Sequence, residues 1–124
     1  METETLTNLE MDNRIKALTP LLEHADMVGY AAARNYRRLM DQNKEYQEQK
    51  AELIKIHGEE YEGGYRIEPG MPGWEDFVRE LTPYCGIEHE VEVYRIPMRE
   101  AAGLITGREI IDCGWMFNDE EGDE

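Results

Sequence analysis

Two cysteines and one histidine are the residues whose chemistry would be most specific in this sequence. Cys85 and His89 stand four positions apart, a spacing that suits two ligands of one metal ion, and Cys113 follows later. A structural zinc site needs four such ligands, usually with a paired Cys-x2-Cys, and only His24 and His57 remain as further candidates. We therefore predict ordinary thiols and a strand histidine, with no metal and no cofactor.

Catalysis by these or other side chains has equally little support. No flanking signature accompanies a cysteine–histidine pair, so a thiol nucleophile is not indicated. Carboxylates are so numerous that a close pair of them does not indicate glycosidase chemistry. The glycine-rich segment 59–73 lacks the GxGxxG and GKS/T patterns of a phosphate-binding loop. The sequence thus predicts a protein that is not an enzyme.

The composition favours binding by charge instead. The 124 residues include 28 Asp and Glu against 13 Lys and Arg, a formal net charge of −15. Residues 1–40 hold six acids and five bases, whereas residues 41–124 hold 22 acids and eight bases. Nucleic acids and anionic membranes are themselves polyanions and repel such a chain. We expect a protein partner with a basic surface, no direct binding of nucleic acid and no membrane association.

A long helix from about residue 25 to residue 57 must position many of these charges. The stretch from Ala31 to Gly58 has no proline and no glycine before its last residue. Small and apolar residues recur at alternating spacings of three and four, as in a coiled-coil seam, but one row of the seam is polar. This row either faces water or forms a recognition face. The candidates on such a face are Asn35, Gln42 and Gln49, with Tyr46 from the neighbouring row.

A shorter helix comes first, opened by a capping box at Thr7–Glu10. Pro20 either kinks this helix or ends it and starts another. On the long helix, tyrosines alternate with arginines at Arg34, Arg37 and Arg38. Such a face is common at protein interfaces and also as ordinary amphipathic surface, and both interpretations stay open.

The second half of the chain predicts smaller elements. Segment 59–73 is either a hairpin turning at Gly63-Gly64 or a mobile flap, and a short helix follows from Trp74. Strict alternation over residues 87–96 predicts a strand with three glutamates on one face. A second capping box at Thr106–Glu109 opens a closing helix. Its apolar side would be formed by Ile110, Ile111, Trp115 and Phe117.

Together these elements predict an α+β, helix-dominated fold in a single domain of residues 1–118. Its long helix packs on the shorter N-terminal helix as a hairpin or kinked pair over residues 7–58. The loop 59–73 then leads to a small helix–strand–helix part over residues 74–118. Residues 119–124, DEEGDE, form an acidic tail that leaves the fold.

The order of these parts resembles a family of small proteins of unknown function from phages and prophages of Gram-positive bacteria. The resemblance covers about residues 5–118 and is carried by ARNYRRLMDQNKEYQEQKAELIKIHG, WEDFVREL, EVEVYRIP and LITGREIIDCGWMF. The segment GGYRIEPGMPG and the two cysteines do not match it. The resemblance implies a phage or mobile-element origin and no particular activity. Since no signal peptide or membrane span is evident, we expect the cytoplasm of the host cell.

Two functions fit these observations. The first is an acidic protein-binding module that inhibits a host nucleic-acid-handling defence enzyme by DNA mimicry, of the anti-CRISPR or anti-restriction type. Its candidate residues are Glu45, Glu48, Glu52, Glu59, Glu60, Glu62, Glu88, Glu90 and Glu92. The alternative is a virion-assembly or structural accessory protein that acts through its long helix, with homo-oligomerisation through the same helix.

Overall fold

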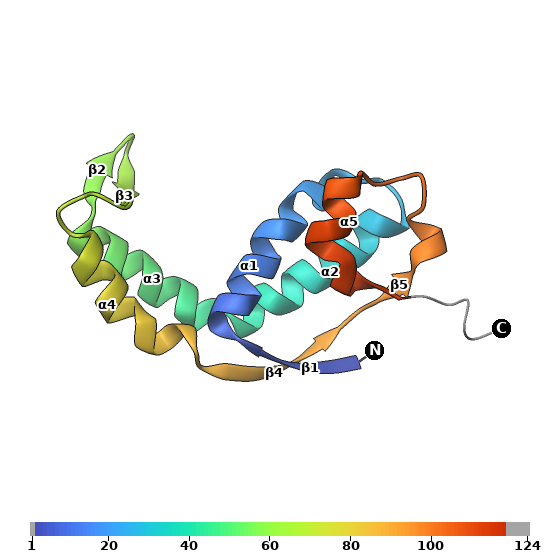
Figure 1. The fold of residues 1–124 in the computed structure, drawn as a ribbon, viewed down its shortest axis with the longest axis horizontal. Helices are drawn as coiled ribbons and strands as arrows, with labels where there is room; N and C mark the ends of the chain where they lie inside the picture. Colours follow the sequence, from blue (N-terminus) through green and yellow to red (C-terminus); the bar gives the residue numbers. More distant parts are fainter. Residues whose placement is uncertain (1, 119–124) are drawn as a thin grey trace.

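The structure, a computed structural model, describes residues 2–118, and helices dominate its α+β architecture (Figure 1). The helices of this part are α1 (Asn8–Leu18), α2 (Met27–Gln42), α3 (Lys44–His57), α4 (Trp74–Cys85) and α5 (Gly107–Cys113). The short strands pair in twos: β1 (Glu2–Thr7) with β4 (Glu88–Val93), β2 (Glu59–Tyr61) with β3 (Gly64–Arg66), and β5 (Ile96–Pro97) with β6 (Phe117–Asn118). The predicted acidic tail, residues 119–124, lies outside the described residues.

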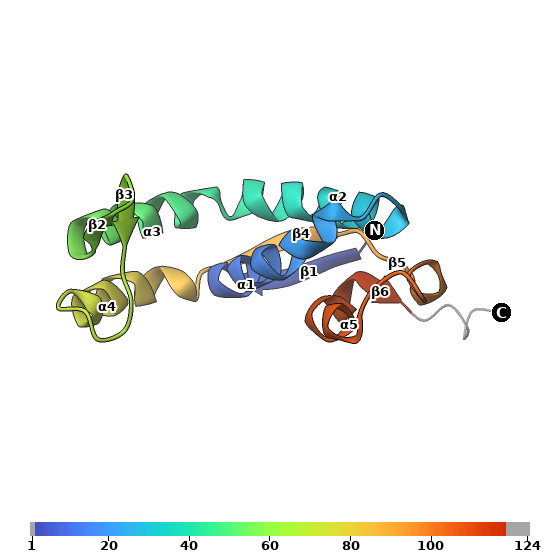
Figure 2. The same ribbon diagram turned by 90° about the horizontal axis from the view of Figure 1, so that it is seen from above.

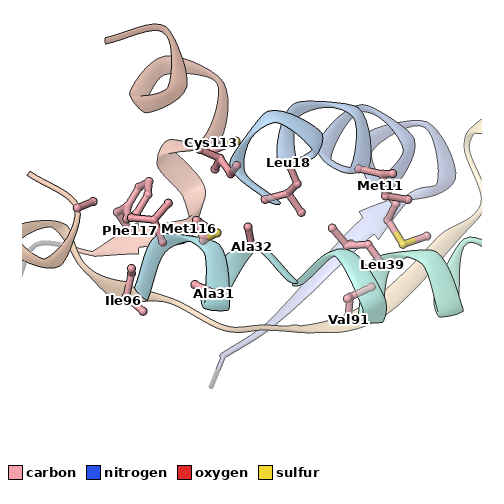
Figure 3. Packing of buried hydrophobic residues seen from close by; sticks show 14 of the residues in the cluster. Met11, Leu18, Ala31, Ala32, Leu39, Val91, Ile96, Cys113, Met116 and Phe117 are labelled. Carbon is pink, nitrogen blue, oxygen red and sulfur yellow. The ribbon is translucent and has the colours of Figure 1, made fainter. Parts of the chain in front are cut away.

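Helices α1, α2 and α5 form a body around the larger hydrophobic cluster (Figure 3). Met11 and Leu18 of α1 are fully buried in it with Leu39 of α2. The predicted capping box at Thr7–Glu10 is present at the start of α1. At its end, Pro20 stops the helix and starts a 3-10 turn over Thr19–Glu23, so the stop-and-restart interpretation is correct.

The single long helix predicted over residues 25–57 is wrong, because the structure has two helices there. Asp26 caps α2, its carboxylate accepting from the amide of Val28 at 2.9 Å. Asn43 separates α2 from α3, and its backbone angles are φ −95° and ψ 4°. The two helices run end to end in Figure 2 and are bent relative to each other in Figure 1.

The predicted strand over residues 87–96 is divided into β4 and β5, and β4 has a partner that the sequence pattern does not predict. Strand β1 pairs with it antiparallel, so that Thr3, Thr5 and Thr7 stand opposite Glu92, Glu90 and Glu88. The other face buries Val91 and Val93. Glu4 lies on that inner face and forms ion pairs with Arg14 of α1 and with Arg95. The pair with Arg14 connects the β1–β4 sheet to α1.

Helices α3 and α4 with the β2–β3 hairpin make an arm, residues 44–85, that projects from the body (Figure 1). The arm has its own small cluster of buried side chains, Tyr46, Leu53, Phe77 and Leu81. The hairpin interpretation of segment 59–73 is correct. The turn, however, is formed by Glu62 and Gly63, with φ of 49° and 84°, and not by Gly63-Gly64.

The closing helix α5 opens with the predicted capping box at Thr106–Glu109. The prediction of its apolar side is wrong for Ile110 and Ile111, which are 40% and 75% exposed. Phe117 is buried as predicted, and Trp115 packs partly buried against the same cluster. Cys113 and Met116 are buried as well. The helix ends at Cys113 and a 3-10 turn follows, so the helical spacing does not extend to Phe117.

Candidate functional site

Buried polar side chains gather where the arm joins the body. Asn43, fully buried at the break between α2 and α3, donates from Nδ2 to the backbone oxygen and Oδ1 of Asn8, at 3.1 and 3.2 Å. Gln47 in turn donates to Asn43 Oδ1 at 2.6 Å and to Asp12 Oδ1 at 2.7 Å. Asn8 also donates to the backbone oxygen of Tyr84 at the end of α4. These bonds hold four segments at one point and fix the direction of the arm.

Asp12 is the charged centre of this junction network. Its carboxylate accepts from Lys50 Nζ at 3.0 Å, and Lys16 Nζ lies 3.3 Å away. Burial by itself raises the pKa of Asp12. The bonds from Gln47 and Lys50 and the charges of Lys50 and Lys16 outweigh burial, so the pKa lies below its ordinary value of 3.8. The residue is therefore a structural carboxylate that stays ionised at neutral pH.

Beside this network the surface is hollowed into a recess of about 300 Å³. The recess lies between the start of α3, the end of α4 and β4. Its lining residues are Asn8, Gln42, Glu45, Tyr46, Gln49, Tyr84, Ile87 and His89. One carboxylate and three amides thus surround a hollow that also has aromatic and aliphatic walls. These groups suit the aliphatic stem and cationic head of a lysine or arginine side chain.

A second hollow, of about 310 Å³, adjoins the recess through Gln42, which lines both. Glu90 and Glu92 of β4 line it together with Asp41 and Arg38 of α2. The structure therefore places Glu45 of α3 and two glutamates of β4 around adjoining hollows, although the sequence separates them by more than forty positions. Glu48 and Glu52 continue along α3 from Glu45 at helical spacing. We call this surface the acidic face; it comprises Asp41, Glu45, Glu48, Glu52, Glu88, Glu90 and Glu92.

All nine glutamates predicted as candidates are exposed. Within residues 2–118, only Glu92 of the nine takes part in an ion pair, with Arg38 at 2.7 Å. Glu59, Glu60 and Glu62 do not belong to the acidic face, because the hairpin that carries them lies at the tip of the arm (Figure 1). The candidates thus fall into two groups, one at the junction and one at the tip.

Two of the predicted partner-binding residues are buried in the protein itself, which corrects their assignment to a recognition face. Asn35, 2% exposed, donates to the backbone oxygen of Tyr94 and accepts from its amide, both at 2.8 Å. Tyr46 is also buried, with its hydroxyl 3.7 Å from Cys85 Sγ. Burial, and then the bond to the Cys85 thiol, raise the pKa of Tyr46. Gln42 and Gln49 are exposed and half-buried, and both line the recess.

The two thiols lie in different parts of the molecule. Cys85 packs against the arm cluster, whereas Cys113 is buried in the body, where Sγ donates to the backbone oxygen of Ala17. Burial raises the pKa of the Cys113 thiol to about 11, and the nearby Asp112 and Glu109 add to this effect. His89, four residues after Cys85, lines the recess. No three His, Cys, Asp or Glu side chains within the described part of the chain are grouped to hold a metal ion.

The junction network was not predicted from the sequence. A signal for it does exist, because Asn43, Gln47 and Lys50 recur at spacings of four and three, and Asn8 and Asp12 are four apart. Each set places polar groups on one helix face. Without the tertiary arrangement, these two sets of polar residues cannot be distinguished from ordinary solvent-facing helix surface.

No protein-family model, no curated protein and no solved structure matches this chain. Among the helices of residues 2–118, none combines the length and the apolar content needed to cross a membrane. Function is therefore inferred from the chemistry and geometry of the surfaces described above.

Proposed function

We propose that the protein is a non-catalytic acidic module that binds a basic surface on another protein through its acidic face. The observation that carries this proposal is the exposure of carboxylates that the chain does not neutralise. Glu45 lines the recess, Glu90 lines the adjoining hollow, and Glu88 precedes Glu90 by two positions on β4. No cation of residues 2–118 forms an ion pair with any of the three. Fixed charge of one sign that is held on a stiff scaffold attracts a complementary surface and speeds the encounter.

The recess gives this face a feature that charge alone does not have. A lysine or arginine of the partner would place its aliphatic stem against Tyr84 and Ile87 and its cation near Glu45. Such an anchor in a pocket accounts for much of the energy of many interfaces, whereas exposed ion pairs at the rim contribute little.

The partner class follows from the charge and from the resemblance to phage proteins. Surfaces with dense positive charge are found where proteins hold nucleic acid, so an acidic ligand of this kind would compete with DNA or RNA for the groove. We infer a host defence enzyme that handles nucleic acid, inhibited by DNA mimicry in the manner of an anti-CRISPR or anti-restriction protein. The inhibitor would act in the host cytoplasm.

The alternative function, assembly through the long helix, is disfavoured by the position of its seam. Val28, Ala32, Asn35, Leu39, Tyr46 and Leu53 are all buried within the chain itself. A second helix would have to displace α1, α4 or β4 to reach them. The other faces of α2 and α3 have no row of apolar residues like this seam that would support association through them.

The test is capture of partners from host lysate by the tagged protein, followed by competition. Proteins that are retained at low salt and released at high salt would be identified by mass spectrometry. Each would then be assayed for nucleic-acid binding with and without the acidic protein. We expect one basic, nucleic-acid-binding protein whose DNA or RNA is displaced, because screening by salt weakens contacts between exposed charges.

A matched pair of variants makes this test specific. Glu88, Glu90 and Glu92 changed together to Gln remove three charges from the acidic face and should abolish capture. Glu23, Glu75 and Glu100 changed to Gln remove the same charge from exposed positions outside that face and should retain it. Equal loss in both variants would mean that only net charge matters. Full retention by the first variant would exclude the three glutamates of β4 from the binding surface.

A further inference from the structure

A groove of about 300 Å³ runs between α1 and the arm, on the flank of α3 away from the recess. Its walls are mostly apolar. They are formed by Leu9 of α1, Ile54 of α3, Ile67 of the loop and, from α4, Trp74, Phe77, Val78 and Leu81. Leu9 and Val78 are 44% and 40% exposed, so this apolar surface meets solvent. Exposed apolar surface that is also concave is typical of a ligand site.

The lining also includes Tyr46, Thr82 and Cys85, and its charged side chains are Asp12, Lys16 and Lys50. The two ammonium groups share the single carboxylate of Asp12, at 3.3 and 3.0 Å, so one positive charge is not balanced there. The side chain of Lys16 is 65% exposed, and an ammonium group has three N–H donors. This end of the groove therefore has hydrogen-bond donors and charge to offer to an anion.

We propose that this groove binds a small amphipathic anion, an aliphatic carboxylate whose chain lies along α4 and whose head group meets Lys16 and Lys50. The occupant is argued from charge complementarity, since an apolar groove with a cationic end matches a molecule with an apolar body and an anionic end. Its volume lies at the lower limit for small-ligand sites. A second copy of the chain fits less well, because two molecules of charge −15 repel each other.

The overall negative charge of the protein opposes the approach of an anion, but only at long range. At physiological ionic strength, charges farther than about 8 Å are screened. Close to the head-group position, the lysines outnumber the one carboxylate that lines the groove. Removal of the alkyl chain from water supplies the remaining driving force.

The experiment is calorimetric titration of the full chain with sodium decanoate below its micelle concentration. Decanol serves as a neutral probe with the same alkyl chain. We expect saturable binding of decanoate at one site and weaker binding of decanol. A change in fluorescence during titration of Trp115→Phe, in which Trp74 is the remaining tryptophan, would place the ligand in the groove.

Three variants locate the site. Val78→Glu puts a carboxylate on the apolar wall and should weaken decanoate binding more than about tenfold. Lys16→Gln should weaken decanoate by about three- to fivefold, the size expected for an exposed charge contact, and leave decanol unaffected. Ile111→Glu makes the same kind of change on α5, away from the groove, and should have no effect.

Several outcomes would overturn the proposal. These are no saturable binding of decanoate, equal binding of decanol, or an unchanged affinity for decanoate in Val78→Glu. Sedimentation would separately reveal a dimer. A dimer that Val78→Glu dissociates would mean that a second copy of the chain fills the groove.

Discussion

At the scale of residues, buried polar side chains are placed where the arm must be held. Asn8, Asp12 and Asn43 are at most 5% exposed, and each bonds to a segment other than its own helix. An unpaired buried polar group is costly, so each of these bonds disfavours any other arm direction. Asn35 does the same for α2 and Tyr94.

Asp12→Asn should destabilise the protein by about 2 kcal/mol at pH 7, because Lys50 keeps its charge and loses its ionic partner. The pKa of Asp12 is lower in the folded state than in the unfolded chain. Its stabilisation is therefore present above about pH 4 and is lost as the pH falls through the folded-state pKa.

Urea unfolding of wild type and Asp12→Asn between pH 7 and pH 2 measures this effect. The two proteins should converge in stability at the acidic end. Asp41→Asn, a change at an exposed aspartate, is the control. A constant difference between wild type and Asp12→Asn at all pH values would show that the carboxylate charge does not matter.

For Cys113 we expect the opposite dependence, a loss of stability as the pH rises. Its pKa rises from 9.0 to about 11 on folding because burial disfavours the thiolate. The neutral thiol is then fully stabilising below pH 9, and this stabilisation falls as the pH rises toward 11. Between pH 8 and pH 10 the loss should be about 1 kcal/mol. Unfolding of Cys113→Ala should depend less steeply on pH over this range, and an equal slope would contradict the assignment.

At the scale of elements, two close backbone contacts set the geometry of the arm. A Cβ at Gly73, the residue before α4, would lie 2.1 Å from the backbone oxygen of His57 at the end of α3. At Gly58 a Cβ would lie 2.2 Å from the backbone oxygen of Arg66 in β3. Glycine at these positions lets α4 and the hairpin approach α3 closely.

Gly73→Ala should therefore push α4 away from α3 and cost about 2 kcal/mol. Gly86→Ala at the other end of α4 is the matched control, because nothing lies within 4 Å of a Cβ there. It should change stability by less than about 0.5 kcal/mol. Amide hydrogen exchange should accelerate in α3 and α4 of Gly73→Ala while α1 keeps its protection. Equal effects of the two substitutions would mean that the close approach is not needed.

The elements that follow from the sequence are those with strong local signals. Both capping boxes, the end of α3 at His57, the start of α4 at Trp74 and the alternation in β4 depend on neighbours in the chain. Strand β1 was not predicted because ETETLT has one apolar residue, and its pairing depends on a segment some ninety positions away. The break at Asn43 was not predicted either, and the bond that Asn43 makes there to Asn8 depends on the packing of α1.

The candidate site shows the same division. The exposure of all nine glutamates follows from their charge and from helix and strand periodicity. Which of them line adjoining hollows does not, because the hollows of Glu45 and Glu90 are brought together by the packing of β4 against α2. Asn35 and Tyr46 fall on the predicted seam, but periodicity does not reveal whether the chain itself or a partner covers it.

At the scale of the whole molecule, two hydrophobic clusters support an elongated shape (Figure 2). The body buries fifteen residues in its cluster and the arm only four. Burial of apolar surface is the main favourable term in folding, so the arm depends on the junction network for its place. A net charge of −15 acts against this arrangement, because like charges along the arm repel one another.

This repulsion predicts that salt stabilises the protein. Raising NaCl from about 0.01 M to 0.15 M shortens the screening length from about 30 Å to about 8 Å, so the melting temperature should rise. The rise should level off near 0.2 M, roughly where screening between neighbouring charges is complete. A continued linear rise to 1 M would indicate salting-out of apolar surface instead.

The variant with Gln at positions 88, 90 and 92 connects this effect to function. Removing three clustered charges should raise the melting temperature at low salt and reduce its dependence on salt, while capture of the basic partner is lost. The control at positions 23, 75 and 100 should gain less stability, because its charges are dispersed. This result would mean that the three carboxylates lower the stability of the protein and are needed for binding. Their role would then be recognition of the partner and not folding. If the first variant melts lower than wild type at low salt, the acidic face is stabilising and this argument fails.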